Sequence, residues 1–158
     1  GVEQDDGKAV ELDTEAADQG DAGAQCNLGY MYRNGRGAAQ DDGKAVEWFT
    51  KATDQGDAAA QCALGCMYQD GRGVAQDDGK AVELYTEAAG QGDAAAQCSL
   101  GCMYQNGRGV AQDDGKAVEL YTEAADQGDA GAQCTLGHLY RNGRGAAQAD
   151  GNAATVFP

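Results

Sequence analysis

Apolar residues recur along this chain at the spacing of an α-helix, and the whole pattern returns every 36 residues. In one stretch Ala60, Leu64 and Met67 fall four and three positions apart, which is typical of one face of a helix. A second stretch of the same unit carries Tyr85 and Ala88 at the same spacing. No stretch alternates with the period of two residues that marks a strand. The pattern therefore predicts an all-α chain built from pairs of helices.

The repeat is nearly perfect in the middle of the chain, where Gly56–Gln91 returns as Gly92–Gln127 with three differences. Each unit of such an array contacts only its neighbours, so we expect one continuous array and no internal domain boundary. The array divides into a half repeat with helix B alone, three full repeats, and a final helix A with a shortened helix B: residues 1–19, 20–55, 56–91, 92–127 and 128–158.

Each full repeat is predicted to hold helix A, a glycine loop, helix B and a turn. Gly71 and Gly73 end helix A because glycine tolerates positive φ. Asp77 or Asp78 caps helix B, since a carboxylate accepts the unpaired N–H groups of a first turn. Gly65 lies inside helix A, where glycine costs about 1 kcal/mol relative to alanine. We therefore expect the backbone of a neighbouring helix B to approach closely at this glycine.

Aromatic residues make up only 6% of the chain, so the core has few large anchors. We expect six large side chains to be largely buried between helices: Leu64, Tyr68, Tyr85, Leu100, Tyr104 and Tyr121.

The two ends of the array lack obvious polar caps, and uncapped arrays expose apolar helix faces. At the C-terminus Asn152 replaces the usual lysine and Pro158 cannot continue a helix, which predicts a short final helix B. We therefore expect end-to-end self-association of copies. The chain begins in mid-repeat at Gly1, without an initiator methionine, and this indicates a fragment of a longer protein.

The formal net charge of −15 bears on the partners of the chain. It argues against nucleic acid and anionic membrane surfaces, because phosphate groups need a basic face. A basic protein or peptide suits it better, and simple solubility is the alternative explanation. No run of about 18 apolar residues occurs, so we expect no membrane-spanning helix.

Six cysteines lie on helix A at two repeat positions: Cys26, Cys62, Cys98 and Cys134, and Cys66 and Cys102. Equivalent cysteines are one repeat apart, on the order of 10 Å, which is too far for a disulfide. Free thiols in a reducing intracellular compartment are therefore expected.

A metal site is the alternative function for the cysteines. Cys98, Cys102, Cys134 and His138 supply the ligand types of tetrahedral zinc. Adjacent A helices are expected to lie too far apart for all four ligands to reach one ion, so we predict no metal and no cofactor.

Catalysis finds little support in the sequence. His138 is the only histidine and Ser99 the only serine, and no lysine follows Ser99 at the spacing of an S-x-x-K nucleophile. A Cys102/His138 pair would need a third orienting group, and nothing in the sequence nominates one. We therefore expect no enzymatic activity.

The spaced pattern of the second full repeat resembles the Sel-1-like repeat family, which is related to the tetratricopeptide repeats. It rests on Ala60, Leu64, Gly65, Tyr68, Gly71, Gly73, Val74, Asp77, Lys80, Ala81, Tyr85, Ala88, Ala89 and Gly92. The resemblance implies a right-handed α/α superhelical solenoid whose concave face is lined by A helices. It also implies an adaptor or scaffold for protein complexes.

Positions that differ among near-identical repeats are candidates for partner binding, with neutral drift as the alternative. Two sets lie three residues apart on helix A and so share a face. By analogy with tetratricopeptide repeats that face is the concave one. The candidate residues are Tyr30, Cys66, Cys102 and His138, and Arg33, Gln69, Gln105 and Arg141.

Taken together, the sequence predicts a non-catalytic scaffold that binds protein or peptide. A metal-binding or redox protein using the cysteines of helix A is the alternative, and a structural spacer with stacking ends is the third reading.

Overall fold

The computed structural model describes residues 5–144, and this part of the chain is helical without a strand. The helices run in the order α1 (Asp6–Asp18), α2 (Ala22–Asn34), α3 (Asp42–Asp54), α4 (Ala58–Asp70), α5 (Asp78–Gly90), α6 (Ala94–Asn106), α7 (Asp114–Asp126) and α8 (Ala130–Arg141). Helix A of the repeats is α2, α4, α6 and α8, and helix B is α1, α3, α5 and α7. The predicted all-α solenoid of 36-residue repeats is confirmed. The short helix B predicted near the C-terminus lies outside the described residues.

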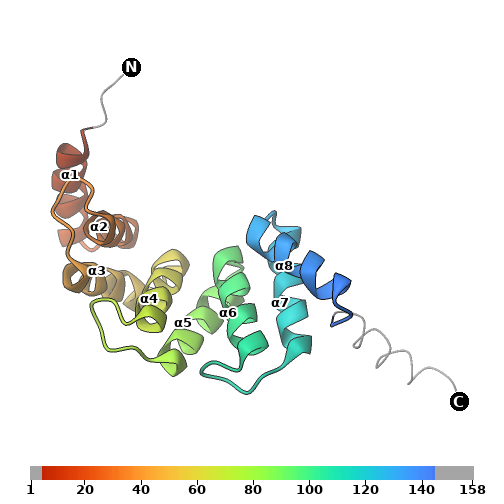
Figure 1. Ribbon diagram of the computed structural model, residues 1–158. Helices are drawn as coiled ribbons and strands as arrows, with labels where there is room; N and C mark the ends of the chain where they lie inside the picture. The colour runs from red at the N-terminus through yellow and green to blue at the C-terminus, as the bar shows by residue number, and fades with distance from the viewer. Residues whose placement is uncertain (1–4, 145–158) are drawn as a thin grey trace, which may run out of the picture.

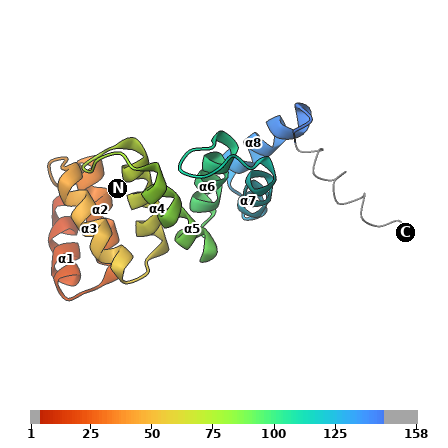
Figure 2. The same cartoon turned by 90° about the horizontal axis from the view of Figure 1, so that it is seen from below.

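The helices follow one another in a single row from α1 to α8 (Figures 1 and 2). The row curves, and α2, α4 and α6 lie on the inner side of the curve in Figure 1, while α1, α3 and α5 lie on its outer side. The helices α2, α4 and α6 each pack most extensively against the helix B that follows through the glycine loop. None of the described helices is both long enough and apolar enough to cross a bilayer.

Aspartates begin every described helix. Asp77 caps α5, because its Oδ1 accepts from the backbone N–H of Lys80 at 3.0 Å. The alternative cap, Asp78, is instead the first residue of that helix. Gly71 ends α4 with a φ of 65°, a left-handed conformation that favours glycine.

The core consists of small residues around a few large ones, as expected. Leu64, Leu100, Tyr85 and Tyr121 are buried between helices. The prediction that Tyr68 and Tyr104 are largely buried is wrong, since both rings are only half-buried. They lie at the surface because the ammonium groups of lysines on the next helix stand about 5 Å from the ring centres, and cation–π attraction holds such pairs at a wet boundary.

A ring, not a backbone, makes the close approach at Gly65. A Cβ atom at this glycine would lie 2.7 Å from Cε1 of Tyr85. The rings of Phe49 and Tyr121 cover Gly29 and Gly101 in the same way. The missing Cβ therefore creates the seat for one aromatic ring in each repeat.

Candidate functional site

The eight candidate binding residues all lie on A helices, and none of them is fully buried. We call them the inner-face residues: Tyr30, Arg33, Cys66, Gln69, Cys102, Gln105, His138 and Arg141. Those on α2 and α4 are half-buried, while Cys102, His138 and Arg141 are exposed. The face is therefore open to solvent along the row of A helices.

The ring of Tyr30 is held from several sides. It meets the ring of Phe49 edge-on at 5.0 Å between centroids. Its hydroxyl donates to the carbonyl oxygen of Ala59 at 3.5 Å, and the guanidinium of Arg33 stacks 4.9 Å from its centre. Burial raises the pKa of Tyr30 to about 12. Tyr30 is thus a neutral, pre-oriented group at the start of the inner face.

The two glutamines in the middle of the inner face are held by tyrosines of helix B. The hydroxyl of Tyr85 donates to Oε1 of Gln69 at 2.7 Å, and that of Tyr121 donates to Oε1 of Gln105 at 2.8 Å. Each bond fixes one end of an amide that still reaches the surface. The middle of the face therefore offers pre-oriented polar groups without net charge.

Cys66 has an unusual environment among the thiols. The hydroxyl of Tyr85 lies 3.3 Å from its Sγ. A hydrogen bond from the Cys62 thiol lowers the pKa of Cys66 to about 6, with help from Tyr85 and the charge of Arg33, while burial opposes the shift. The same bond, followed by burial, raises the pKa of Cys62.

The C-terminal end of the inner face is cationic. Nη2 of Arg141 lies 3.0 Å from Nδ1 of His138 on the same face of α8. Within the A helices themselves the other ionised side chains are Arg33 and Asp70. Helix B carries most of the carboxylates.

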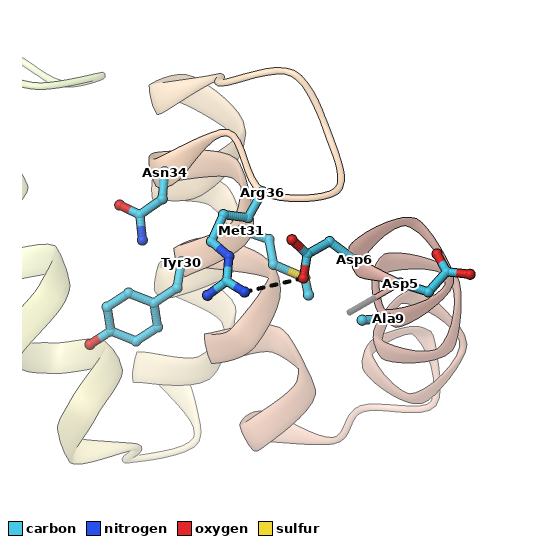
Figure 3. A pocket seen from close by; sticks show the side chains of 7 residues that line it. All are labelled: Asp5, Asp6, Ala9, Tyr30, Met31, Asn34 and Arg36. Carbon is cyan, nitrogen blue, oxygen red and sulfur yellow. Dashed lines mark hydrogen bonds and ion pairs between the residues drawn. The ribbon is translucent and has the colours of Figure 1, made fainter. Parts of the chain in front are cut away.

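A pocket of about 300 Å³ lies beside the N-terminal end of the inner face, between α1 and α2. Figure 3 shows Arg36 reaching across it to Asp6 while Tyr30 lines its other side. The guanidinium and the carboxylate are 3.1 Å apart. In the next repeats the residue matching Met31, which lines this pocket, is buried as Met67 or Met103.

Four of the six arginines lie in the glycine loops and are neutralised by ion pairs, a feature that sequence reasoning missed. Loop arginines pair with the first aspartate of the preceding helix B at 2.7 to 3.1 Å: Arg36–Asp6, Arg72–Asp42, Arg108–Asp78 and Arg144–Asp114. The signal available in the sequence was the constant separation of 30 residues. The second Asp of each Asp-Asp-Gly triplet therefore joins repeats, whereas the first caps a helix.

A second missed feature is a set of buried glutamines at the start of helix A. Gln61 donates to Oε2 of Glu87 at 2.9 Å and accepts from Nε2 of Gln91 at 2.7 Å. Gln97 has the same two kinds of partner one repeat later. The recurring Ala-Gln-Cys triplet was the available signal, because a polar residue between buried ones needs an internal partner.

The proposed zinc ligands are not brought together. Across residues 5–144 no three His, Cys, Asp or Glu side chains are placed to hold one metal ion. All six cysteines are free thiols, of which Cys26 and Cys62 are buried as small packing residues. Burial raises the pKa of Cys26 to about 12, so this thiol is protonated at neutral pH.

Comparison with known proteins gives a consistent result along the chain. The family model described as Sel1 repeat matches residues 1–21, 22–57, 58–93, 94–129 and 130–155. The Sel1 repeat protein from Oxalobacter formigenes is 40% identical with a TM-score of 0.84, and the match covers 92% of this chain and 59% of that one. A search of curated proteins found no match.

Two further solved structures are similar. The protective antigen c5321 of uropathogenic Escherichia coli, which displays an SLR fold, is 35% identical with a TM-score of 0.80, over 90% of this chain and 30% of that one. Helicobacter pylori cysteine rich protein B is 25% identical with a TM-score of 0.64, over 86% and 98%. This chain thus spans 59% and 30% of the length of the first two relatives.

Proposed function

Because this chain belongs to the Sel1 repeat family, whose members are generally scaffolds for protein interaction, we propose that its inner face binds an extended segment of protein or peptide. The family is typically non-enzymatic, and we propose that this chain catalyses nothing.

The observation that carries the proposal is that the repeats differ from one another at the inner-face positions. Some packing positions are held constant, and Leu28, Leu64 and Leu100 are all buried. The inner-face residues differ between the end repeats and the middle repeats, and all of them are solvent-accessible. Arginine stands at both ends of the face and glutamine in the middle, which gives an extended ligand two distinct points of attachment. Tyrosine and arginine are also the residue types enriched at binding hot spots.

Pre-organisation supports the same surface. Tyr30 is fixed by Phe49 and Ala59, and Gln69 is fixed by Tyr85. A group that is already ordered loses little entropy when a ligand binds it.

The net charge of the chain and its two inner-face arginines indicate which class of partner it binds. The net charge of −15 attracts a basic protein and raises its association rate, and salt weakens this effect. Arg33 and Arg141 act at short range and favour acceptor groups on the ligand. The proposed partner is therefore basic overall and presents carboxylate or carbonyl oxygens to the two arginines. Self-association through the ends of the array is a separate proposal, which shares His138 and Arg141 with this surface.

The test compares two double variants that remove the same charge. Arg33→Gln with Arg141→Gln gives the end repeats the residue that the middle repeats already carry, so the fold tolerates it. Lys44→Gln with Lys51→Gln makes the same charge change on helix B, at two exposed positions of α3. Peptides are first selected on the native chain from a phage-displayed library of random linear sequences, and their Kd is then measured by fluorescence anisotropy.

We expect the inner-face double variant to raise the Kd about tenfold or more, as loss of an arginine contact does, and the control to leave it within about twofold. Equal affinity for both variants, or failure to select any peptide, would overturn the assignment of the inner face.

A further inference from the structure

The most exposed large hydrophobic side chains in residues 5–144 stand at opposite ends of the array. Leu12 on α1 is 58% exposed and Tyr140 on α8 is 57% exposed. The residues at matching positions of the other repeats are all half-buried: Trp48, Leu84 and Leu120 for Leu12, and Tyr32, Tyr68 and Tyr104 for Tyr140. Each end therefore displays one half of an interface that the chain builds internally between helix A and the following helix B.

We propose that copies of this chain associate head to tail, with α1 of one copy seated on α8 of the next in the place of a helix B. The sequence of α1 suits this role. It is identical to that of α7 at every position except one, where Asp13 stands in place of Tyr121. A helix that differs so little from an internal helix B can make the internal contacts between copies.

The lysine and tyrosine contact of the internal interface is reproduced in this arrangement. Within the array Nζ of Lys80 lies 5.1 Å from the ring centre of Tyr68. The corresponding pair between copies is Lys8 of one copy and Tyr140 of the next. In the sequence, Asn152 stands at the repeat position that Lys80 and Lys116 occupy in the earlier units.

The apolar contact is reproduced as well. Within the array Leu84 of α5 and Leu64 of α4 line the same pocket. The matching residues at the ends are Leu12, which is exposed, and Leu136, which is half-buried. Seating α1 on α8 covers both, and burial of apolar surface is the main favourable contribution to such an association.

Asp13 is the one residue of α1 that differs from α7, and it complements the residues at which α8 differs from the other A helices. Asp13 takes the place of Tyr85, which contacts the inner-face cysteine and glutamine of its own repeat. On α8 the corresponding inner-face residues are His138 and Arg141, whose side chains lie 3.0 Å apart. A carboxylate complements the Arg141 guanidinium as the tyrosine hydroxyl complements cysteine and glutamine. Among the described residues no atom lies within 4 Å of a Cβ built at Gly137, so the seat is open there.

A contact between two different ends is heterologous, and it continues from copy to copy instead of closing at a dimer. The weight-average mass should therefore keep rising with concentration. The rival occupant of α8 is the chain's own segment 145–158, in which Phe157 stands in register with Tyr121. If segment 145–158 covers α8, the mass stays that of a monomer; if a second copy covers it, the mass rises with concentration.

The experiment is sedimentation equilibrium of the full chain from about 1 μM to about 1 mM at about 0.15 M NaCl, where the repulsion between copies of net charge −15 is screened. We expect the native mass to pass that of a dimer. Asp13→Arg should weaken association at least about tenfold, because it meets Arg141 with like charge. Adding Arg141→Asp to Asp13→Arg should restore association to within about threefold, since the pair is re-formed with its charges exchanged.

Glu11→Arg is the matched control, because it makes the same charge change at an exposed position of α1. Circular dichroism establishes that each variant is folded. A native mass that stays monomeric, equal effects of Asp13→Arg and Glu11→Arg, or no recovery in the exchanged pair would each overturn the proposal. If the native chain is monomeric and Phe157→Ala both destabilises it and induces association, segment 145–158 is the occupant instead.

Discussion

At the scale of single residues, Tyr85 links the packing of a repeat to its inner face. Its ring fills the space left by Gly65, and its hydroxyl reaches Gln69 and Cys66 on the surface. Burial raises the pKa of Tyr85, so it remains a hydrogen-bond donor at physiological pH. One buried residue therefore sets the orientation of two accessible ones.

Cys66 should react with iodoacetamide faster than the other thiols at neutral pH. Only the thiolate attacks, displacing iodide, and the pKa of Cys66 is lowered from 9.0 to about 6. Its rate should rise through about pH 6 and level off above about pH 7, because the thiolate is then fully formed. Mass spectrometry of quenched samples measures the rate at each cysteine separately.

Two controls accompany this measurement. Cys102 occupies the same position of the next repeat and serves as an internal comparison in every sample. Arg33→Gln should move the midpoint of Cys66 upward, because a positive charge that favours the thiolate is lost. A rate at Cys66 that still climbs between about pH 8 and 9 would show that the thiol is not perturbed.

The sequence predicted burial of residues that pack along one helix stripe, such as Leu64 and Tyr85. It did not predict the surface position of Tyr68, because its partner Lys80 lies on another helix. The buried bond of Gln61 to Glu87 was missed for the same reason. Periodicity reports which face of a helix is apolar, but pairing between faces depends on how the helices are placed.

At the scale of elements, the loop between helix A and helix B connects neighbouring repeats. Gly73 has a φ of 69°, and a Cβ at this position would clash with the carbonyl oxygen of Asp42. Arg72, one residue earlier, pairs with the carboxylate of the same aspartate at 2.7 Å. Backbone and side chain of the loop thus dock together on the N-terminus of α3.

Gly73→Ala should lower the stability of the chain more than Arg72→Ala does. The glycine variant combines a strained positive φ with a backbone clash, for which about 2 to 4 kcal/mol is expected. The arginine pair is partly exposed, so its loss should cost about 1 kcal/mol or less. Urea unfolding followed by circular dichroism gives both free energies.

Gly56→Ala is the matched control for strain alone. Gly56 has a φ of 83°, and a Cβ there would meet no atom within 4 Å. The Gly56→Ala substitution should therefore lower the free energy of unfolding by about 1 kcal/mol, because of the strained φ alone and without any steric clash. Equal losses for Gly56→Ala and Gly73→Ala would show that the loop does not press on α3 as described.

Helix ends were largely predictable from the sequence, since Gly71 was expected to end helix A and is the C-cap of α4, which spans Ala58–Asp70. Glycines, aspartates and apolar spacing are local signals, and helix ends depend on them. Use of the inner face remains a prediction, because binding depends on a partner whose chemistry the chain does not contain.

At the scale of the whole molecule, acidic residues greatly outnumber basic ones. The chain has 26 acidic and 11 basic residues, and folding brings these charges closer together. Four surface ion pairs offset the repulsion by about 1 kcal/mol each at most. Net repulsion should therefore outweigh attraction in the folded state.

Added salt should raise the melting temperature of the dilute chain. Screening of the net charge between about 0.02 and 0.2 M NaCl should increase Tm by a few degrees, even though the ion pairs weaken. Scanning calorimetry at a concentration below that of association measures the shift, and KCl at equal ionic strength provides the control for ion identity. A decrease of Tm over this range would mean that attractive pairs dominate.

The constant 30-residue separation of the Arg–Asp pairs bears on how such chains can change length through inheritance. Loss of Gly56–Gln91 would join Gln55 to Gly92 and bring Arg108 into register with Asp42, which is the pair that Arg72 now makes. The other contacts between repeats are also re-formed, with Ser99 in the place of the buried Ala63. Duplication or deletion of one 36-residue unit in the coding sequence leaves no mismatched junction, so the length of the inner face can evolve in whole steps without a compensating mutation.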